Sequence, residues 1–376
     1  MKNKILFLIP NLKIAGAEMV VIDLADKLAE SEYQIGIISL SEDVPFFSRV
    51  RNKNTIKLYT CGKSTFRFPW FSLKRLILFR KAIKQFKPNI VHSHLWSIHC
   101  IYLLLFFSKR KKSKIYHTIH ITDSHYTDDQ FIYKFFRFVE IAIVKFLNSK
   151  VISISEEVDM LCKKKLRFKD VCKISNGINT DYYKPIKADN YVSTRLGIPK
   201  DSFVILNIGR YHKQKGQIFL LKALHILIKN GCLNCYLVFA GKDIEQNLKT
   251  QVRALKLEEY VKFVGVFDNI PRLVAVADIG VFPSLYEGFG LACGEMMSCG
   301  LPTIISNIPP LVEMSRNGQG ALITPVGQSD AIADAILNLK NNKILRRNLS
   351  ITGRKIIQND FSLDCQVQKH IEIYNG

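Results

Sequence analysis

Acidic residues are missing from one long stretch of this 376-residue chain. No Asp or Glu occurs between Val44 and Thr122, whereas Lys and Arg recur there, and the whole chain has a formal net charge of +22. A strongly basic stretch favours anionic partners. The imbalance therefore predicts that the first half of the chain meets an extended anionic partner or the surface of a membrane.

Long hydrophobic runs are also scarce. Apart from the N-terminal segment, the longest run extends from Cys100 to Phe107, far short of the roughly 20 residues that a membrane-spanning helix needs. The N-terminal apolar run stops at Pro10 and Asn11, before it reaches the length of a signal-peptide core. We therefore expect no transmembrane segment, a buried first strand and a cytoplasmic protein.

Cysteines do not cluster as they would in a disulfide-stapled or zinc-binding protein. The chain has nine, and its lone C-x-x-C, Cys232 and Cys235, lacks the second pair that a zinc site requires. Isolated cysteines usually pack as small hydrophobic residues. We expect reduced thiols with structural roles.

Histidines are more frequent in the first half, but their positions do not predict a metal site. We expect His92, His94, His99, His117 and His120 to lie along strands and to face different sides. No Cys or carboxylate accompanies them at ligand spacing. The sequence therefore predicts no bound metal.

Short β-branched runs alternate along the chain with longer segments of helical period. This rhythm is typical of parallel sheets with crossover helices, and Glu18–Glu30 is a clear amphipathic helix. The chain is too long for one core, and the polar stretch from Asp181 to Lys200 predicts a domain boundary. The expected strands are Ile5–Ile9, Ile35–Ser39, Thr55–Tyr59, Ile90–His92, Lys114–His117, Val151–Ile154 and Lys173–Ser175, then Val204–Ile208, Tyr236–Ala240, Val261–Val264, Ile279–Phe282, Thr303–Ile305 and Leu322–Thr324.

Two segments that follow first strands have the composition of phosphate sites. Gly16 opens a helix after the first strand of the first domain, and Arg210 and Lys215 follow the first strand of the second. Helix N-termini attract phosphate, and an Arg–Lys pair suits two neighbouring phosphoryl groups. An ordinary turn and a solvated basic loop are the alternatives. The dinucleotide fingerprint G-x-G-x-x-G is missing, which argues against a nicotinamide dehydrogenase.

A third segment, from Glu287 to Glu295, pairs two carboxylates around a glycine-rich helix start. If the helix begins near Gly290, the carboxylates lie about 12 Å apart, too far to share a proton. They could accept hydrogen bonds from opposite ends of a nucleotide-sugar. A capping Glu and a solvent-facing Glu are the alternative.

Together these motifs resemble those of family 4 glycosyltransferases of the GT-B fold, and the resemblance covers nearly the whole chain. It implies an α/β protein of two Rossmann-like doubly wound domains that face each other across a cleft. The expected parts are an acceptor-binding domain (1–187), a nucleotide-sugar-binding domain (188–358) and a C-terminal helix (359–376) that crosses back to the first domain. The marks are Ala15-Gly16-Ala17-Glu18, His92-Ser93-His94, His117-Thr118, Ser153-Ile154-Ser155, Asn176-Gly177-Ile178, Gly209-Arg210, Lys215-Gly216, Ala240-Gly241-Lys242-Asp243 and the E-x7-E pair Glu287/Glu295.

The resemblance assigns the phosphate, base and reacting-centre contacts. It implies that Arg210 and Lys215 bind the donor diphosphate and that Gly16 approaches it from the other domain. His117 matches a histidine beside the reacting centre. Val266 is a weaker candidate for holding the nucleobase through its backbone.

The resemblance also implies separate roles for the residues of the third segment, from Glu287 to Glu295. Glu287 would contact the donor sugar and Glu295 the ribose. Phe289, Gly290 and Leu291 would offer backbone amides to the phosphates. Glu287, His117, Arg210 and Lys215 are the expected catalytic residues.

The expected activity is a retaining transfer of a hexose or N-acetylhexosamine from a nucleoside-diphosphate sugar, with UDP the expected nucleotide. Two cations would replace a metal ion, so we expect no cofactor. Aromatic and cationic residues alternate in 66–81 and 101–112, which favours docking at an anionic lipid surface. A solvated basic face with aromatic residues in the core is the alternative. We expect a peripheral enzyme on the cytoplasmic face of the inner membrane, with a lipid-linked glycan acceptor, in bacterial surface polysaccharide or lipopolysaccharide assembly.

Two other functions compete with this one. A sugar-nucleotide epimerase of the same fold would share the nucleotide site but would not need a basic, aromatic first domain. A nucleic-acid-binding protein would explain the charge, but no recognised DNA or RNA module occurs. We therefore expect no nucleic-acid partner.

Overall fold

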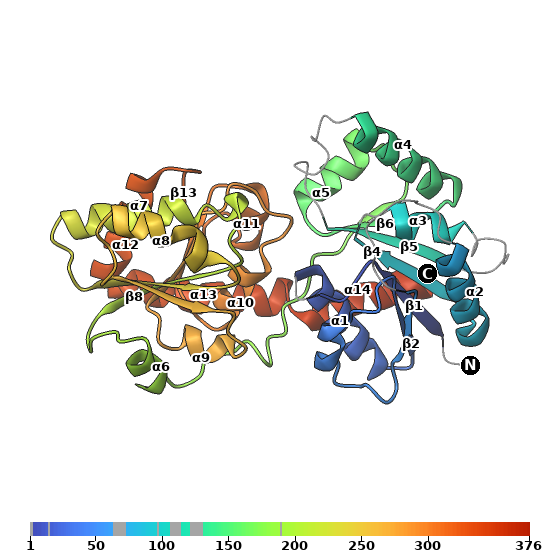
Figure 1. The fold of residues 1–376 in the computed structure, drawn as a ribbon, viewed down its shortest axis with the longest axis horizontal. Helices are drawn as coiled ribbons and strands as arrows, with labels where there is room; N and C mark the ends of the chain where they lie inside the picture. Colours follow the sequence, from blue (N-terminus) through green and yellow to red (C-terminus); the bar gives the residue numbers. More distant parts are fainter. Residues whose placement is uncertain are drawn as a thin grey trace. The chain divides into compact units, whose positions relative to one another are not determined.

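A computed structural model describes residues 3–13, 16–62, 73–95, 98–105, 114–120, 131–188 and 190–376. The chain divides into two compact units (Figure 1). Unit 1 comprises 1–177 and 363–376, and unit 2 comprises 178–362. Among the described residues, no helix is long and apolar enough to cross a membrane.

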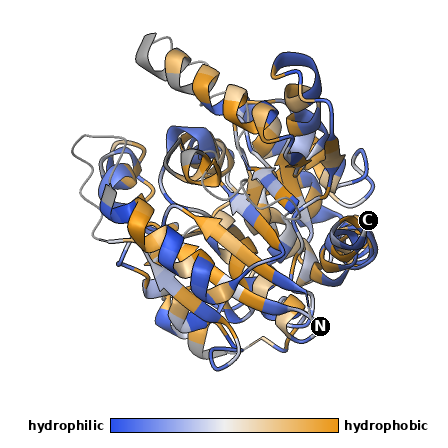
Figure 2. Ribbon diagram, turned by 90° about the vertical axis from the view of Figure 1, so that its right-hand side faces the viewer, coloured by the Kyte–Doolittle hydropathy of each residue, from blue (hydrophilic) through white to orange (hydrophobic). Residues whose placement is uncertain are grey.

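Unit 1 is built on a seven-stranded parallel sheet of order β3-β2-β1-β4-β5-β6-β7. Its central strands are runs of fully buried residues, as expected where helices cover both faces of a parallel sheet. Figure 2 shows these strands coloured as hydrophobic between helices of mixed colour. The strands are β1 (Lys4–Ile9), β2 (Gln34–Ser39), β3 (Lys57–Thr60), β4 (Ile90–His94), β5 (Lys114–Ile119), β6 (Lys150–Ser153) and β7 (Val171–Lys173).

Two apolar layers cover the sheet of unit 1. On one face, Ile5, Phe7 and Ile9 pack with the helices α1 and α14. On the other face, Leu6 and Leu8 pack with α2 and α3, and α3 contacts α4. The helices are α1 (Gly16–Ala29), η1 (Pro45–Arg49), α2 (Leu73–Phe86), α3 (Ile98–Leu104), α4 (Phe131–Phe146), α5 (Glu156–Met160), η3 (Leu161–Lys165) and α14 (Leu363–Asn375).

Unit 2 contains a six-stranded parallel sheet of order β10-β9-β8-β11-β12-β13. The strands are β8 (Phe203–Ile208), β9 (Cys235–Ala240), β10 (Val261–Gly265), β11 (Ile279–Phe282), β12 (Thr303–Ser306) and β13 (Leu322–Thr324). The helices are α6 (Asn190–Arg195), η4 (Lys213–Lys215), α7 (Gln217–Lys229), α8 (Ile244–Ala254), α9 (Ile270–Val274), α10 (Leu291–Ser298), α11 (Pro309–Met314), α12 (Ser329–Asn341) and α13 (Lys343–Asp360).

The expected strands are all present, with small shifts at their ends. β7 lies two residues earlier than the expected Lys173–Ser175, and β3 begins at Lys57 rather than Thr55. The α/β fold class of two doubly wound domains is confirmed.

The chain passes between the units at 177/178 and 362/363, whereas the sequence predicted 187/188 and 358/359. Ile178 explains the difference, because its amide donates to the Phe361 carbonyl at 2.8 Å and it forms a parallel bridge with Ser362. These contacts join the two ends of unit 2. The proline-containing polar stretch therefore lies inside unit 2, and α14 belongs to unit 1.

The topology of each sheet creates one switch point, where the strand order reverses. It lies between β1 and β4 in unit 1 and between β8 and β11 in unit 2. In open parallel sheets, ligands bind beyond the carboxyl ends of the strands at such points. Gly16 follows β1, whereas Arg210 and Lys215 follow β8 and Glu287 follows β11.

Candidate active site

Gly216 brings together the loops that follow β8 and β11. Its φ of +62° lies in the left-handed region, and a Cβ there would lie 1.9 Å from the carbonyl oxygen of Pro283. Only glycine allows this approach. A backbone bond from the Leu285 amide to the Gln214 carbonyl, 2.7 Å long, fixes the same contact.

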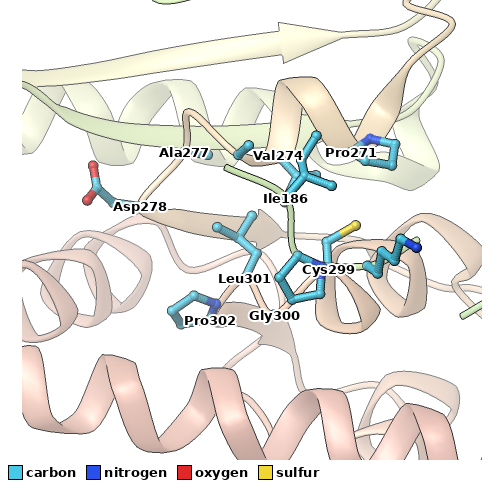
Figure 3. Close-up of a pocket in the computed structure, with 12 residues that line it drawn as sticks. Ile186, Pro271, Val274, Ala277, Asp278, Cys299, Gly300, Leu301 and Pro302 are labelled. Atoms are coloured by element: carbon cyan, nitrogen blue, oxygen red, sulfur yellow. The ribbon is translucent and has the colours of Figure 1, made fainter. Parts of the chain in front are cut away.

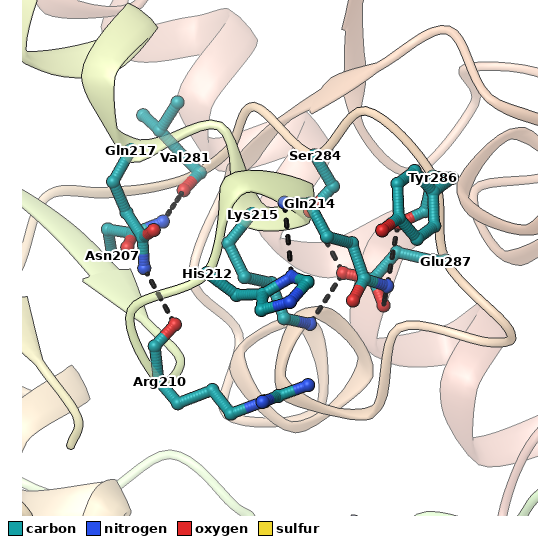
Figure 4. Close-up of polar contacts among 10 residues, drawn as sticks. All are labelled: Asn207, Arg210, His212, Gln214, Lys215, Gln217, Val281, Ser284, Tyr286 and Glu287. Atoms are coloured by element: carbon teal, nitrogen blue, oxygen red, sulfur yellow. Dashed lines mark hydrogen bonds and ion pairs between the residues drawn. The ribbon is translucent and has the colours of Figure 1, made fainter. Parts of the chain in front are cut away.

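Glu287 lies at the centre of this junction and is only 6% exposed. Its Oε1 accepts hydrogen bonds from Lys215 Nζ at 2.6 Å and from Ser284 Oγ at 2.9 Å (Figure 4). Its Oε2 receives only a long contact, 3.5 Å, from Gln214 Nε2 among the described residues. A carboxylate oxygen can accept two hydrogen bonds, so Oε2 can still accept bonds from hydroxyl groups.

Arg210 and Lys215 supply positive charge at the same place. Lys215 is held by Glu287, whereas the Arg210 side chain is exposed. In Figure 4 the guanidinium of Arg210 and the amino group of Lys215 point toward the same side of the loop. The Arg210 backbone is fixed, because Gln217 Nε2 donates to its carbonyl at 3.0 Å. The structure thus brings Arg210, Lys215 and Glu287 together.

The helix start after Glu287 is open at its N-terminus. α10 begins at Leu291, as the sequence predicted, and its cap Gly290 has φ +93° and no side chain to bond the first amides. A Cβ on Gly290 would meet Leu311 at 2.5 Å. The first amides of a helix lack carbonyl partners and carry partial positive charge, so this end favours an anion.

The other predicted donor contacts are spread over their units. In unit 2, Glu295 is partly buried on α10, Phe289 is buried, and Val266 is 61% exposed just after β10. In unit 1, Gly16 is exposed at the first position of α1. Their contacts with a donor remain predictions.

The expected arrangement of the histidines is partly wrong. His92 and His94 are two residues apart on β4, so they share one face of the sheet, and their ring centroids are 4.1 Å apart. His94 Nδ1 lies 3.1 Å from His120 Nε2, and the His370 ring of α14 lies 5.6 Å from His92. His117 faces the other way, where its Nδ1 bonds the Ser93 hydroxyl. His99 lies in α3 and not in a strand, so the expectation for it was wrong.

These histidines form a neutral cluster, which we call the histidine cluster (His92, His94, His120 and His370). Burial, together with the neighbouring histidines, holds the pKa of His92 and of His94 well below its usual value. Burial also lowers the pKa of His370 to about 4. Within the described parts of the chain, no group of three or more His, Cys, Asp or Glu side chains could hold a metal ion.

His117 and His120 differ in their access to a substrate. His117 lies within β5 and is completely buried, and burial lowers the pKa of both His117 and His120 to about 3. His120 follows the last residue of β5 and is partly exposed at the carboxyl end of the sheet. Position separates the two histidines, because a side chain just past a strand end reaches the ligand edge and one inside the strand does not. The role expected of His117 stays a prediction.

A separate pocket of 190 Å³ lies in unit 2 (Figure 3). Asp278 and Pro302 on its wall precede β11 and β12, so the pocket lies at the amino ends of the strands. None of Arg210, Lys215 and Glu287 lines it. The pocket and the charged junction therefore occupy opposite ends of the sheet.

Thiols in the apolar stretches are buried, as the sequence predicted, among them Cys61, Cys100 and Cys293. Cys232 Sγ lies 3.3 Å from Cys235 Sγ.

Comparison with known proteins identifies the family. The family model described as "Glycosyltransferase Family 4" matches residues 14–182, and the one described as "Glycosyl transferases group 1" matches residues 192–356. The chain is a family 4 glycosyltransferase. The two models correspond to the two Rossmann-like units of the GT-B fold.

Relatives of this glycosyltransferase extend over most of its length. An Escherichia coli UDP-Gal:alpha-D-GlcNAc-diphosphoundecaprenol alpha-1,3-galactosyltransferase is 26% identical over 80% of this chain and 79% of its own. The Escherichia coli O-antigen biosynthesis glycosyltransferase WclY is 26% identical over 99% and 98%. HepE of Anabaena, solved in complex with UDP and glucose, has the same fold, with a TM-score of 0.82, 22% identity and 99% of each chain covered.

Proposed function

We propose that this glycosyltransferase moves a hexose or N-acetylhexosamine from a UDP-sugar to a hydroxyl group, with retention of anomeric configuration. The observation that carries the proposal is the junction of Arg210, Lys215 and Glu287 at the ends of β8 and β11. Two cations suit a diphosphate, and a buried carboxylate with an open oxygen suits sugar hydroxyls. The names of HepE's ligands and of the Escherichia coli galactosyltransferase's donor support UDP as the nucleotide.

A bound donor would have to break the Lys215–Glu287 ion pair and give each of the two side chains a new partner. Without a donor, the 2.6 Å contact neutralises both groups in a largely buried place. A bound diphosphate would compete for Lys215, and the donor sugar's hydroxyls would replace Lys215 at Glu287. Exchange of partners keeps the buried carboxylate hydrogen-bonded throughout, which avoids the cost of an unpaired charge.

The transfer itself would break the bond between the anomeric carbon and the diphosphate oxygen. Arg210, Lys215 and the amides of Phe289, Gly290 and Leu291 would stabilise the charge that develops on the leaving UDP. The acceptor hydroxyl would attack on the same face, and its proton would pass to the departing phosphate oxygen. In unit 1, the partly exposed His120 is better placed for contact with a substrate than the predicted His117.

We further propose that the reaction needs no divalent metal, because Arg210 and Lys215 supply the positive charge that Mg²⁺ provides elsewhere. Turnover should persist in EDTA. Loss of turnover in EDTA that Mg²⁺ or Mn²⁺ restores would contradict this part of the proposal.

The proposed acceptor is a lipid-linked glycan of bacterial surface polysaccharide assembly. The Escherichia coli galactosyltransferase is named for a diphosphoundecaprenol acceptor, and WclY is named for O-antigen biosynthesis. The acid-free stretch from Val44 to Thr122 suits an anionic diphosphate lipid and the membrane that holds it. The enzyme would then act as a peripheral protein on the cytoplasmic face of the inner membrane.

A panel of UDP-sugars tests the proposal against its alternatives. The protein is incubated with UDP-glucose, UDP-galactose and their N-acetylamino counterparts, and products are followed by NMR. Slow hydrolysis of one of them supports a retaining transferase if it releases UDP and the free sugar first appears as its α-anomer. Conversion of one nucleotide sugar into another would indicate an epimerase, and no binding of any of them would contradict the proposed donor.

A further inference from the structure

Helix α4 exposes large aromatic side chains on its outer side. Phe135 is 54% exposed, Phe138 69% and Phe146 79%. Their spacing of i, i+3 and i+11 places them on one side of the helix, and we call them the aromatic stripe. Glu140 and Val144, on the opposite side, are buried.

The stripe differs from the single exposed hydrophobic residues that most surfaces carry. Three exposed phenylalanines line one side of one helix, and exposed apolar groupings of this kind mark contact surfaces. In Figure 2, α4 lies at the top of the view and is coloured as hydrophobic along much of its length. α4 therefore has an inner side that packs on unit 1 and an outer side that suits a second apolar environment.

Basic residues accompany the stripe on the same side of the sheet. α2 covers the same face of the unit 1 sheet as α3, which contacts α4. Lys74, Ile77, Lys81 and Lys84 of α2 are exposed, and their spacing of i, i+3, i+7 and i+10 places them on one side of that helix. α2 contains no acidic residue.

We propose that the aromatic stripe and the basic side of α2 (Lys74, Lys81 and Lys84) form the surface through which unit 1 docks on an anionic phospholipid bilayer. Phenylalanine rings enter the boundary between headgroups and acyl chains, and lysines pair with anionic headgroups. The acid-free sequence from Val44 to Thr122 favours this occupant over a protein surface, whose charges are usually mixed. The inference deepens the proposed function, since it names the membrane partner that a lipid-linked acceptor requires.

Part of the sequence that first suggested a membrane contact, 66–72 and 106–112, lies outside the described residues. The stripe on α4 was not part of that expectation. It rests on the exposure of Phe135, Phe138 and Phe146 alone.

Vesicle co-sedimentation of the full chain tests the surface. Phosphatidylcholine vesicles are used with and without phosphatidylglycerol, at low and at high salt. The wild type should bind only the anionic vesicles, and salt should weaken binding. Phe138→Ser/Phe146→Ser should lower the partition coefficient about tenfold or more, and Lys81→Glu/Lys84→Glu should abolish the preference for phosphatidylglycerol.

A matched control variant and two further measurements distinguish a specific loss of vesicle binding from misfolding or loss of activity. Leu233→Ser/Ile344→Ser changes two residues of unit 2 that are 59% and 76% exposed, and it should bind vesicles as the wild type does. All variants should keep the wild-type circular dichroism spectrum and the wild-type rate of UDP release in solution. A wild type that releases no UDP would contradict the proposed function and leave the vesicle result valid.

Two results would overturn the inference. One is equal vesicle binding by the wild type and Phe138→Ser/Phe146→Ser. The other is a wild-type dimer in sedimentation equilibrium that this variant dissociates, without vesicle binding, because a second copy would then cover the stripe.

Discussion

The central strands of the two sheets lead into side chains of different kinds, charged in unit 2 and neutral in unit 1. At the switch point of unit 2, Lys215 and Glu287 form a 2.6 Å ion pair beside the exposed Arg210. At the switch point of unit 1, β4 ends in His94, which contacts His120. The same topology fixes where a ligand can bind, and the side chains at the strand ends decide which ligand it is.

This difference matches the two substrates of a glycosyl transfer. A charged nucleoside diphosphate needs paired ions, whereas a hydroxyl acceptor needs neutral polar groups. The positive charge of unit 1 lies instead on its outer surface, for example on Lys74, Lys81 and Lys84 of α2. The following predictions test whether the two units behave as differently as their strand ends suggest.

The largest expected effect is acid unfolding of unit 1. Burial lowers the pKa of His117 to about 3 and of His370 to about 4, whereas an unfolded histidine titrates near 6.5. The unfolded state therefore binds more protons below about pH 6.5, and each buried histidine costs up to about 1.4 kcal/mol of stability per pH unit below it. Above about pH 6.5 the buried histidines do not lower the free energy of unfolding. This free energy falls as the pH drops from about 6.5 towards 4.

Far-ultraviolet circular dichroism follows this transition, because each unit contains a sheet and helices of its own. The signal should be lost in two steps on acidification, and unit 1 should unfold in the step at higher pH. In unit 2, His212 and His225 are both partly exposed. His370→Gln should move the midpoint of the first step to lower pH, and an unchanged midpoint would show that the histidine cluster does not set acid stability.

The next largest effect concerns the cations of unit 2. Arg210→Ala and Lys215→Ala should each lower kcat by about 10²–10³, or about 3–4 kcal/mol of transition-state stabilisation. Lys213→Ala is the matched control, since Lys213 is exposed in the same short helix η4. Steady-state UDP release by the three variants distinguishes a specific loss from a general loss of positive charge.

Backbone geometry at the junction gives a third prediction. Gly216→Ala should destabilise the protein by about 2 kcal/mol or more, because it adds a clash with Pro283 to the strain of a left-handed alanine. Gly197→Ala has a matching φ of +60° but no atom within 4 Å of the new Cβ. Urea unfolding should show a clearly larger loss of unfolding free energy for Gly216→Ala than for Gly197→Ala. Equal losses would contradict the close approach of the two loops.

Ser284 should give the smallest effect. Ser284→Ala removes one of two donors to Glu287 Oε1 and leaves Lys215 in place. A neutral donor to a charged acceptor contributes about 1.5–3 kcal/mol at most, so kcat should fall about tenfold with an unchanged KM for the acceptor. Rescue by Ser284→Thr would support a positioning role.

The sequence predicted the strands well, because runs such as Cys235–Ala240 are buried on both faces and read as continuous apolar segments. It also placed Arg210, Lys215 and Glu287 correctly at strand ends. It could not show that Lys215 and Glu287 bond each other, since 72 residues separate them and their contact depends on β8 lying beside β11.

The histidines show where pattern reasoning failed. His92 and His94 share a face by simple strand period, yet their contact with His370 requires that α14 return to unit 1 from the far end of the chain. The aromatic stripe was missed for a related reason. α4 carries apolar residues on more than one side, with Phe135, Phe138 and Phe146 opposite Val144, so its sequence alone does not reveal which side is buried.

Calorimetric titration of the protein with UDP tests the central claim most directly, namely that the Arg210–Lys215–Glu287 junction of unit 2 binds the nucleoside diphosphate. The wild type and Lys213→Ala should bind UDP with the same Kd, without added metal, and Lys215→Ala and Arg210→Ala should each weaken binding about tenfold or more. Wild-type affinity for UDP in both of these variants would contradict the account.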